Sequence, residues 1–367
     1  VLQPDGSKEP VDIRTLGVFR FEENEAHTEG LYGMVFAGNN QGGSPLGSRE
    51  RLDQVDRTGP DTEHPHILRN LKIWQVHYAL RPQIPQMRME NVTINHAVYG
   101  IYRPMFENQE YVHLAILDTS GEPFNRGMDD ASTQYGRVTV DGLTFSGYYN
   151  GSGMPLIQIS DNDPSGKGES HFRSLRWMNG NGGGKREIFD RGGGAQVEPV
   201  TETGVAYYVH DHFGSGRHAK VVSRKAANHL KEGHEYRSEP PFTGRDTLVA
   251  EVSDVEFPRL LNPVDDLPPA TAITSVRRTG GGLEVRGVSH DNGEIVRVLV
   301  NEREAEIVSQ QAGVADWRIT LPAPDDGQVV ARAADAAGNL EWHAHSVDGP
   351  YRRSDASGRC AGYYDGR

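Results

Sequence analysis

Short segments in which apolar and polar residues alternate recur along the first half of the chain. A strand-like run with a polar bend occurs three times, at 19–27, 67–74 and 87–94. Each is followed by a shorter aromatic and apolar run, at 30–34, 77–80 and 97–101. Asn70 and Asn91 occupy equivalent positions 21 residues apart, as do Tyr78 and Tyr99. A period near 20 residues with two or three short strands is typical of one coil of a β-solenoid. The pattern therefore predicts an all-β protein.

The solenoid that we expect is a right-handed parallel β-helix over residues 1–261. Each strand of such a coil pairs with the equivalent strands above and below, so Asn70 should lie next to Asn91, and Asn24 should extend the same ladder. Asn suits a repeated bend because it tolerates left-handed backbone and can bond the next coil. The chain opens in mid-pattern without a polar cap, so we expect further coils, in an N-terminal half of the same protein, to contact this one.

The second half of the chain contains the predicted end of the solenoid and a second domain. Residues 205–260 should form the last coils and a closing cap with a short helix at 224–232, and the proline-containing segment 262–269 should be a linker. Short strands with regular turns over 270–348 predict an immunoglobulin-like β-sandwich. Residues 349–367 are a C-terminal tail in this division.

Composition and charge exclude several classes of protein. The net charge of −13 argues against a nucleic-acid partner, since phosphate binding needs an excess of Lys and Arg on one face. No run of eighteen apolar residues occurs, so the sequence predicts no membrane-spanning segment. Cys360 is the single cysteine and cannot form an internal disulfide.

The motifs at residues 16–34, 70–74 and 89–101, with Asn125-Arg126-Gly127-Met128-Asp129-Asp130, resemble those of the G8-domain β-helix proteins. That group includes the cell-surface hyaluronidases and related hyaluronan-binding proteins, and this chain is most similar to the C-terminal half of its secreted bacterial members. The resemblance implies a secreted or cell-surface protein that handles carbohydrate, with an acidic polysaccharide as its partner.

Carboxylates near the coil surface are the candidate catalytic groups. Asp129 and Asp130 beside Arg126, with Asp161 and His171, could serve glycoside hydrolysis, in which one carboxylic acid protonates the leaving oxygen and another activates water. Sequential residues of a strand point to opposite faces, so only one of Asp129 and Asp130 could reach the substrate. A solvated loop is the alternative for this run.

Two other clusters suggest metal binding. Asp161 and Asp163 lie in an oxygen-rich turn that suits calcium, although EF-hand spacing is absent. His210 and His212 would share one face if both lie on a strand, a geometry used for transition metals such as zinc. Exposed histidines near a cap and an ordinary Asp-rich turn are the alternatives.

Arginines that recur along the coils are candidates for binding an acidic glycan against the global charge. Arg81, Arg103 and Arg126 are the predicted substrate-binding residues, and Arg69 and Arg88 are further candidates. Arg81 and Arg103 are 22 residues apart and should stack as a basic ladder. Arginines that merely pair with Glu or Asp on neighbouring coils are the alternative. Two functions follow from the sequence: a glycoside hydrolase or lyase acting on an acidic glycan, or a non-catalytic carbohydrate-binding or surface β-helix.

Overall fold

In the computed structural model the chain is all-β and divides into two compact units between Pro263 and Val264. This boundary falls inside the segment 262–269. We call Asp12–Pro263 the N-terminal unit and the part from Val264 onward the C-terminal unit. The structure describes residues 18, 20–28, 30–37, 61–102, 104, 108–125, 137–146, 154–159, 169–178, 187–190, 205–224, 227–230, 232–253, 255–322 and 327–348.

The N-terminal unit contains two sheets, which we call the long sheet and the short sheet. The long sheet contains β1 (Phe21–Glu22), β2 (Glu25–His27), β4 (His66–Arg69), β5 (Lys72–Trp74), β7 (Met87–Asn95), β9 (Gln109–Leu117), β11 (Arg137–Ser146), β13 (Glu169–Met178), β15 (Ala206–His210), β16 (His218–Ser223) and β17 (Thr247–Val252). The short sheet contains β3 (Tyr32–Ala37), β6 (Tyr78–Gln83), β8 (Tyr99–Tyr102), β10 (Phe124–Asn125), β12 (Ile157–Gln158) and β14 (Phe189–Asp190).

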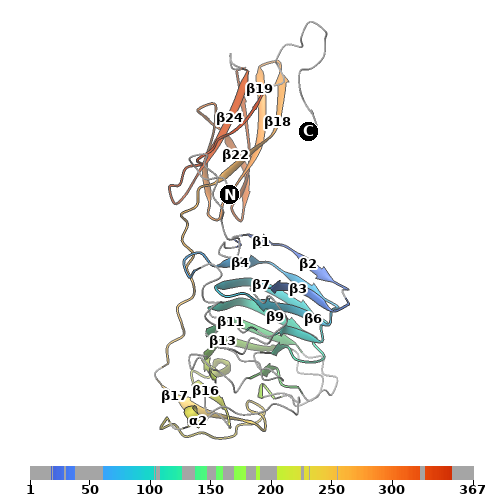
Figure 1. Ribbon diagram of the computed structural model, residues 1–367, viewed down its shortest axis with the longest axis vertical. Coiled ribbons are helices and arrows are strands. Elements are labelled where there is room, and N and C mark those ends of the chain that lie inside the picture. The colour runs from blue at the N-terminus through green and yellow to red at the C-terminus, as the bar shows by residue number, and fades with distance from the viewer. Residues whose placement is uncertain are drawn as a thin grey trace. The chain divides into compact units, whose positions relative to one another are not determined.

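From β7 to β15 the chain alternates between the two sheets, one strand at a time. From β7 to β13 each strand pairs in parallel with the strands one circuit before and after it, as in β9 with β7 and β11. Figure 1 shows β4, β7, β9, β11 and β13 lying one above another. The last three long-sheet strands pair antiparallel, and a single turn of helix, α2 (Ala227–Leu230), lies between β16 and β17.

The two sheets enclose a continuous apolar core. Five rings form a column in which each meets the next edge to face, with centroids 5.3–5.8 Å apart: Tyr111, Phe124, Phe172, Phe189 and Phe242. Each of these rings is at most 4% exposed. The inward positions of the alternating pattern therefore form the core of this unit.

The asparagine ladder is confirmed for two of its three members. Asn91 Nδ2 donates to Asn70 Oδ1 at 3.2 Å, and both residues have left-handed backbone. The prediction for Asn24 is wrong, because the register of β1 and β2 against β4 and β5 places Glu23 opposite Asn70. Glu23 has a φ of 55°, whereas the Asn24 amide bonds the Glu22 carbonyl. The same ladder continues through His113, Gly142 and Ser174.

Gly100 of β8 is required by a close approach of two circuits. A Cβ atom there would lie 2.1 Å from the Pro123 carbonyl oxygen of the next circuit. We expect Gly100→Ala to lower the free energy of unfolding of the N-terminal unit by about 1–3 kcal/mol, since neighbouring backbone must shift. Denaturant melts of this variant and of Gly30→Ala, which has open space around it, give the comparison. Equal stability of the two variants would contradict the prediction.

The C-terminal unit consists of two four-stranded antiparallel sheets. One has the order β18 (Ala270–Thr279), β19 (Gly282–His290), β23 (Val314–Leu321) and β22 (Glu306–Gln311). The other has the order β21 (Arg303–Glu304), β20 (Ile295–Val300), β24 (Gln328–Asp335) and β25 (His345–Asp348). Both sheets contribute to one core around Trp317, whose indole N–H donates to Ser289 Oγ at 3.0 Å.

Candidate functional site

The bend at the ladder divides the outer face of the long sheet into two halves. On the N-terminal side of the bend in each strand, the residues that alternate with outward-facing ones are in the core. The outward-facing residues on this side include Arg88, Glu110, Asp141, His171 and Arg173. Residues after the bend point outward at Lys72, Thr93, Ala115, Thr144 and Arg176. We call these the first half and the open half of the outer face.

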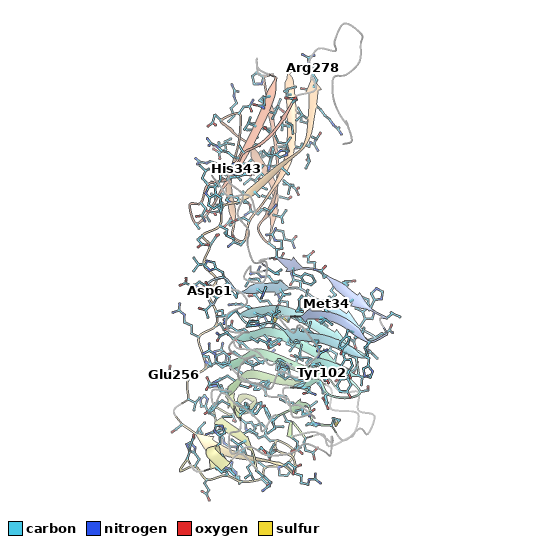
Figure 2. All side chains as sticks on the ribbon, viewed as in Figure 1. Met34, Asp61, Tyr102, Glu256, Arg278 and His343 are labelled. Atoms are coloured by element: carbon cyan, nitrogen blue, oxygen red, sulfur yellow. The ribbon has the colours of Figure 1, made fainter. Side chains whose placement is uncertain are left out.

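The first half is covered by residues 255–263, which we call the strap. Both carboxylate oxygens of Glu110 accept the Leu261 N–H, at 2.7 and 2.9 Å, and Arg88 Nη1 donates to the Leu261 carbonyl at 2.6 Å. Further along, Arg173 Cζ lies 3.9 Å from the centroid of the Phe257 ring. The strap lies on the side of the stack away from β8 (Figure 2, Glu256 and Tyr102).

Glu110 is the perturbed acid under this strap. Its side chain is 1% exposed, and burial raises the pKa of its carboxyl to about 7. The Leu261 N–H and the guanidinium groups of Arg88 and Arg137 oppose this rise in pKa, while the Glu90 carboxylate adds to it. The strap is therefore held by a carboxyl group that changes charge near neutral pH.

A groove of about 370 Å³ lies at the bend, beside the open half. It is lined by His113, Leu114, Ala115, Asp141, Gly142, Thr144, Ser174 and Arg176. At the ladder position the earlier circuits have the larger residues Asn70, Asn91 and His113, and the later circuits have Gly142 and Ser174. The smaller side chains leave room for the groove. Gly142 also has a φ of 85°, which favours glycine, and a Cβ there would lie 3.2 Å from the His113 ring.

The charges of the groove are unevenly paired. Arg173 binds Asp141 in a bidentate manner, with Nε 2.9 Å from Oδ1, and the Asp141 carboxylate raises the pKa of the Arg173 guanidinium. Arg176 is exposed and makes no hydrogen bond or ion pair with any residue that the structure describes. The groove therefore offers a guanidinium that no described residue pairs with, beside the hydroxyls of Thr144 and Ser174 and the imidazole of His113.

The arginines predicted to bind a glycan have other contacts. Arg69 pairs with Glu22 and Glu90 at 3.1 and 2.9 Å, and Arg88 pairs with Glu90 at 2.6 Å. For Arg69 and Arg88 the structure shows the alternative of ion pairing: Arg69 pairs with carboxylates of both neighbouring strands, and Arg88 pairs with Glu90 of its own strand. Arg81 lies on the short sheet and donates to the Tyr32 hydroxyl at 3.2 Å.

Most of the predicted catalytic and metal-binding residues lie outside the described part of the chain. This holds for Asp129, Asp130, Asp161 and Asp163, and for Arg103 and Arg126. Their predicted roles, and calcium binding at Asp161 and Asp163, stay predictions.

The structure brings together two of the predicted histidines, His171 and His210. His171 Nδ1 lies 3.1 Å from His210 Nε2, and both side chains are 4% exposed. Burial is the largest cause of the fall in the pKa of His210 to about 4, and the neighbouring His171, His218 and Arg173 lower it further. The Glu169 carboxylate lies 3.4 Å from His171 Nε2, and this interaction with His171 lowers the pKa of Glu169.

His212 does not share a strand face with His210. The strand β15 ends at His210, and Asp211 turns the chain with a φ of 49° into the short 3₁₀ helix η2 (His212–Gly214). The His212 ring packs on Phe242 instead, at 3.9 Å between centroids. The prediction of a common face was wrong because a left-handed residue intervenes.

Among the described residues, one group of three carboxylates could hold a cation. Asp265, Asp291 and Asp335 of the C-terminal unit have ligand oxygens within 4.8 Å of one another. Burial and the two neighbouring carboxylates raise the pKa of Asp265. Local structure accounts for part of this cluster, because Asp291 accepts the Gly293 N–H and Asp335 accepts the Asn339 N–H.

No protein-family model matches the chain, and neither a curated protein nor a solved structure matches it. The resemblance to the G8-domain proteins therefore stays a prediction. In the part of the chain that the structure describes, no helix has the length and apolar character needed to span a membrane.

Proposed function

We propose that this protein binds an acidic polysaccharide along the open half of the long sheet, with Arg176 holding a carboxylate of the sugar chain. The observation that carries the proposal is Arg176, which has no partner among the described residues and lies in a polar groove of a chain whose net charge is −13. A guanidinium fork binds carboxylates in a bidentate manner, and hydroxyl and imidazole groups suit the hydroxyls of a sugar.

The proposed architecture is a right-handed parallel β-helix followed by an immunoglobulin-like sandwich. Strand alternation between two parallel sheets supports the first, and two antiparallel sheets around Trp317 support the second. Such a coil presents a face that suits an extended ligand. The open half runs from β2 through β5, β7, β9 and β11 to β13, roughly 24 Å at a spacing of ~4.8 Å per strand.

The test compares two single substitutions. We expect Arg176→Gln to weaken binding of hyaluronan oligosaccharides about tenfold or more, since a hydrogen-bonded charge contributes roughly 1.5–3 kcal/mol. Isothermal titration calorimetry at two salt concentrations measures it, with a neutral glucan as the second ligand.

Arg259→Gln is the matched control, because Arg259 is an exposed arginine of the strap that does not line the groove. It should keep wild-type affinity. An equal loss in both variants would indicate a general charge effect, and unchanged binding by Arg176→Gln would reject the groove as the binding site.

Cleavage of the same polysaccharide is a second candidate function. It is favoured by polar groups that gather on the outward side of β13, β15 and β16: Glu169, His171, Tyr208, Lys220 and Glu232. Two carboxyl groups are what a glycoside hydrolase uses, and a base is what a lyase needs. Loss of reducing-end release or of unsaturated products in Glu169→Gln would support it. Because acidic polysaccharides of this kind are extracellular, both functions place the protein in the secreted or cell-surface compartment.

A further inference from the structure

Three imidazoles gather on the outward side of neighbouring strands near the end of the long sheet. His171 of β13 and His210 of β15 have ring centroids 5.3 Å apart, and His210 lies 5.5 Å from the ring of His218 of β16. The sheet places them there, since β15 pairs with both β13 and β16. The Tyr208 and Phe257 rings pack against His171 and His210 and exclude water from the two imidazoles.

Two nitrogens of this cluster lack a hydrogen bond among the described residues. His171 Nε2 and His218 Nδ1 are buried and make no hydrogen bond of good geometry with any described residue, and His171 Nε2 has the Glu169 carboxylate at the longer distance of 3.4 Å. The His171 side chain is 4% exposed. Buried polar atoms without partners are rare in folded proteins and indicate a missing ion, a missing water or a functional role. The facing pair, His171 Nδ1 and His210 Nε2, is 3.1 Å apart.

We propose that these imidazoles form a binding site for a transition metal ion, with Zn²⁺ as the ion that the donor set suits. Two nitrogens 3.1 Å apart can both reach one ion at the ~2.0–2.1 Å of a zinc–imidazole bond. His218 supplies the third ligand after its ring rotates toward His210, and water completes a tetrahedral set. His218 therefore takes the place that the sequence assigned to His212.

Glu169 stands where a positioning carboxylate is found in zinc sites. Its Oε1 lies 3.4 Å from His171 Nε2, the nitrogen that faces away from His210. Metal-bound histidines commonly donate their second N–H to a carboxylate, which fixes the tautomer and orients the ring. The cations nearby do not oppose an incoming dication strongly, since Arg173 is paired with Asp141 and Lys220 with Glu232.

This site does not depend on the proposed polysaccharide function. The simplest rival is a structural hydrogen bond between two neutral imidazoles, which would leave the nitrogens of His171 and His218 unsatisfied. The two arrangements differ in one measurable respect: the zinc site retains a stoichiometric metal ion, and the hydrogen-bonded imidazole pair does not.

The experiment uses the full chain, stripped with a chelator and then titrated with Zn²⁺ or Co²⁺. We expect one bound Zn²⁺ per chain that persists through gel filtration, a higher melting temperature with zinc, and the visible absorption of tetrahedral Co²⁺ bound to nitrogen ligands. Glu169→Gln should weaken zinc binding about 10–100-fold, as for other residues that orient a metal ligand. The Glu169 side chain is 42% exposed, so this variant should fold.

His210→Gln should abolish zinc retention and the cobalt absorption, while the control His96→Gln should change neither. His96 lies at an exposed bend, where its ring contacts Asn95. Zinc retained at full stoichiometry by His210→Gln would place the ion elsewhere, for example at the carboxylates of the C-terminal unit, and would overturn the proposal. Absence of any retained ion in the wild-type chain would do the same.

Discussion

We expect the free energy of unfolding of the N-terminal unit to fall by about 3 kcal/mol, through Glu110, as pH rises from 4.5 to 7. The folded pKa of this carboxyl is raised to about 7 from 4.5, so the folded chain keeps a proton that the unfolded chain releases. The contribution of protonated Glu110 to the free energy of unfolding is fully present below pH 4.5 and is lost as pH rises through 7. Each unit of pKa corresponds to about 1.4 kcal/mol.

Glu110→Gln isolates this contribution from the other groups that titrate in the same range. The Gln side chain keeps an amide oxygen that can accept the Leu261 N–H but has no charge to bury. Urea melts between pH 4.5 and 8 should show that the free energy of unfolding of the variant, relative to that of the wild type, rises by about 3 kcal/mol as pH increases. Most of this relative rise should occur between pH 5 and 7. Parallel curves for the two proteins would show that Glu110 ionises without cost under the strap.

The repeating part of the fold follows from spacing alone. Apolar alternation locates β7, β9, β11 and β13, and the separation of Asn70 and Asn91 gives the register in which their side chains bond. The pattern fails at Asn24 because the sequence there offers two adjacent polar residues, Glu23 and Asn24. The pairing of β1 and β2, and not the identity of the residue, decides which of them occupies the left-handed position.

The candidate site depends on contacts that spacing does not reveal. The Leu261 N–H bonds Glu110, 151 residues earlier in the chain, and no local pattern indicates such a contact. Arg176 is marked as outward-facing by the alternation of its strand, but only the structure shows that no described carboxylate pairs with it. Arg69 and Arg88 show the reverse case, in which residues that look free in the sequence are paired, Arg69 with carboxylates of neighbouring strands and Arg88 with Glu90 of its own strand.

Substitution of Phe172 should produce the largest loss of stability in the N-terminal unit. Its ring is fully buried and meets Phe124 and Phe189 edge to face at 5.6 and 5.7 Å, joining the long sheet to the short sheet. We expect Phe172→Ala to cost about 3–5 kcal/mol, because the change removes apolar burial and leaves a cavity between two rigid sheets. Denaturant unfolding, followed by a probe in this unit, measures the difference.

Leu31→Ala is the control, since Leu31 is 54% exposed and its truncation opens no cavity. It should change stability by less than about 0.5 kcal/mol. Because each circuit pairs with the next, the gap left by Phe172→Ala should also loosen the circuits on both sides of it. Hydrogen exchange should then show lost protection in β11 and β15 as well as in β13. Protection lost in β13 alone would mean that the circuits are held by their backbone ladders and that the ring column contributes little to their cooperation.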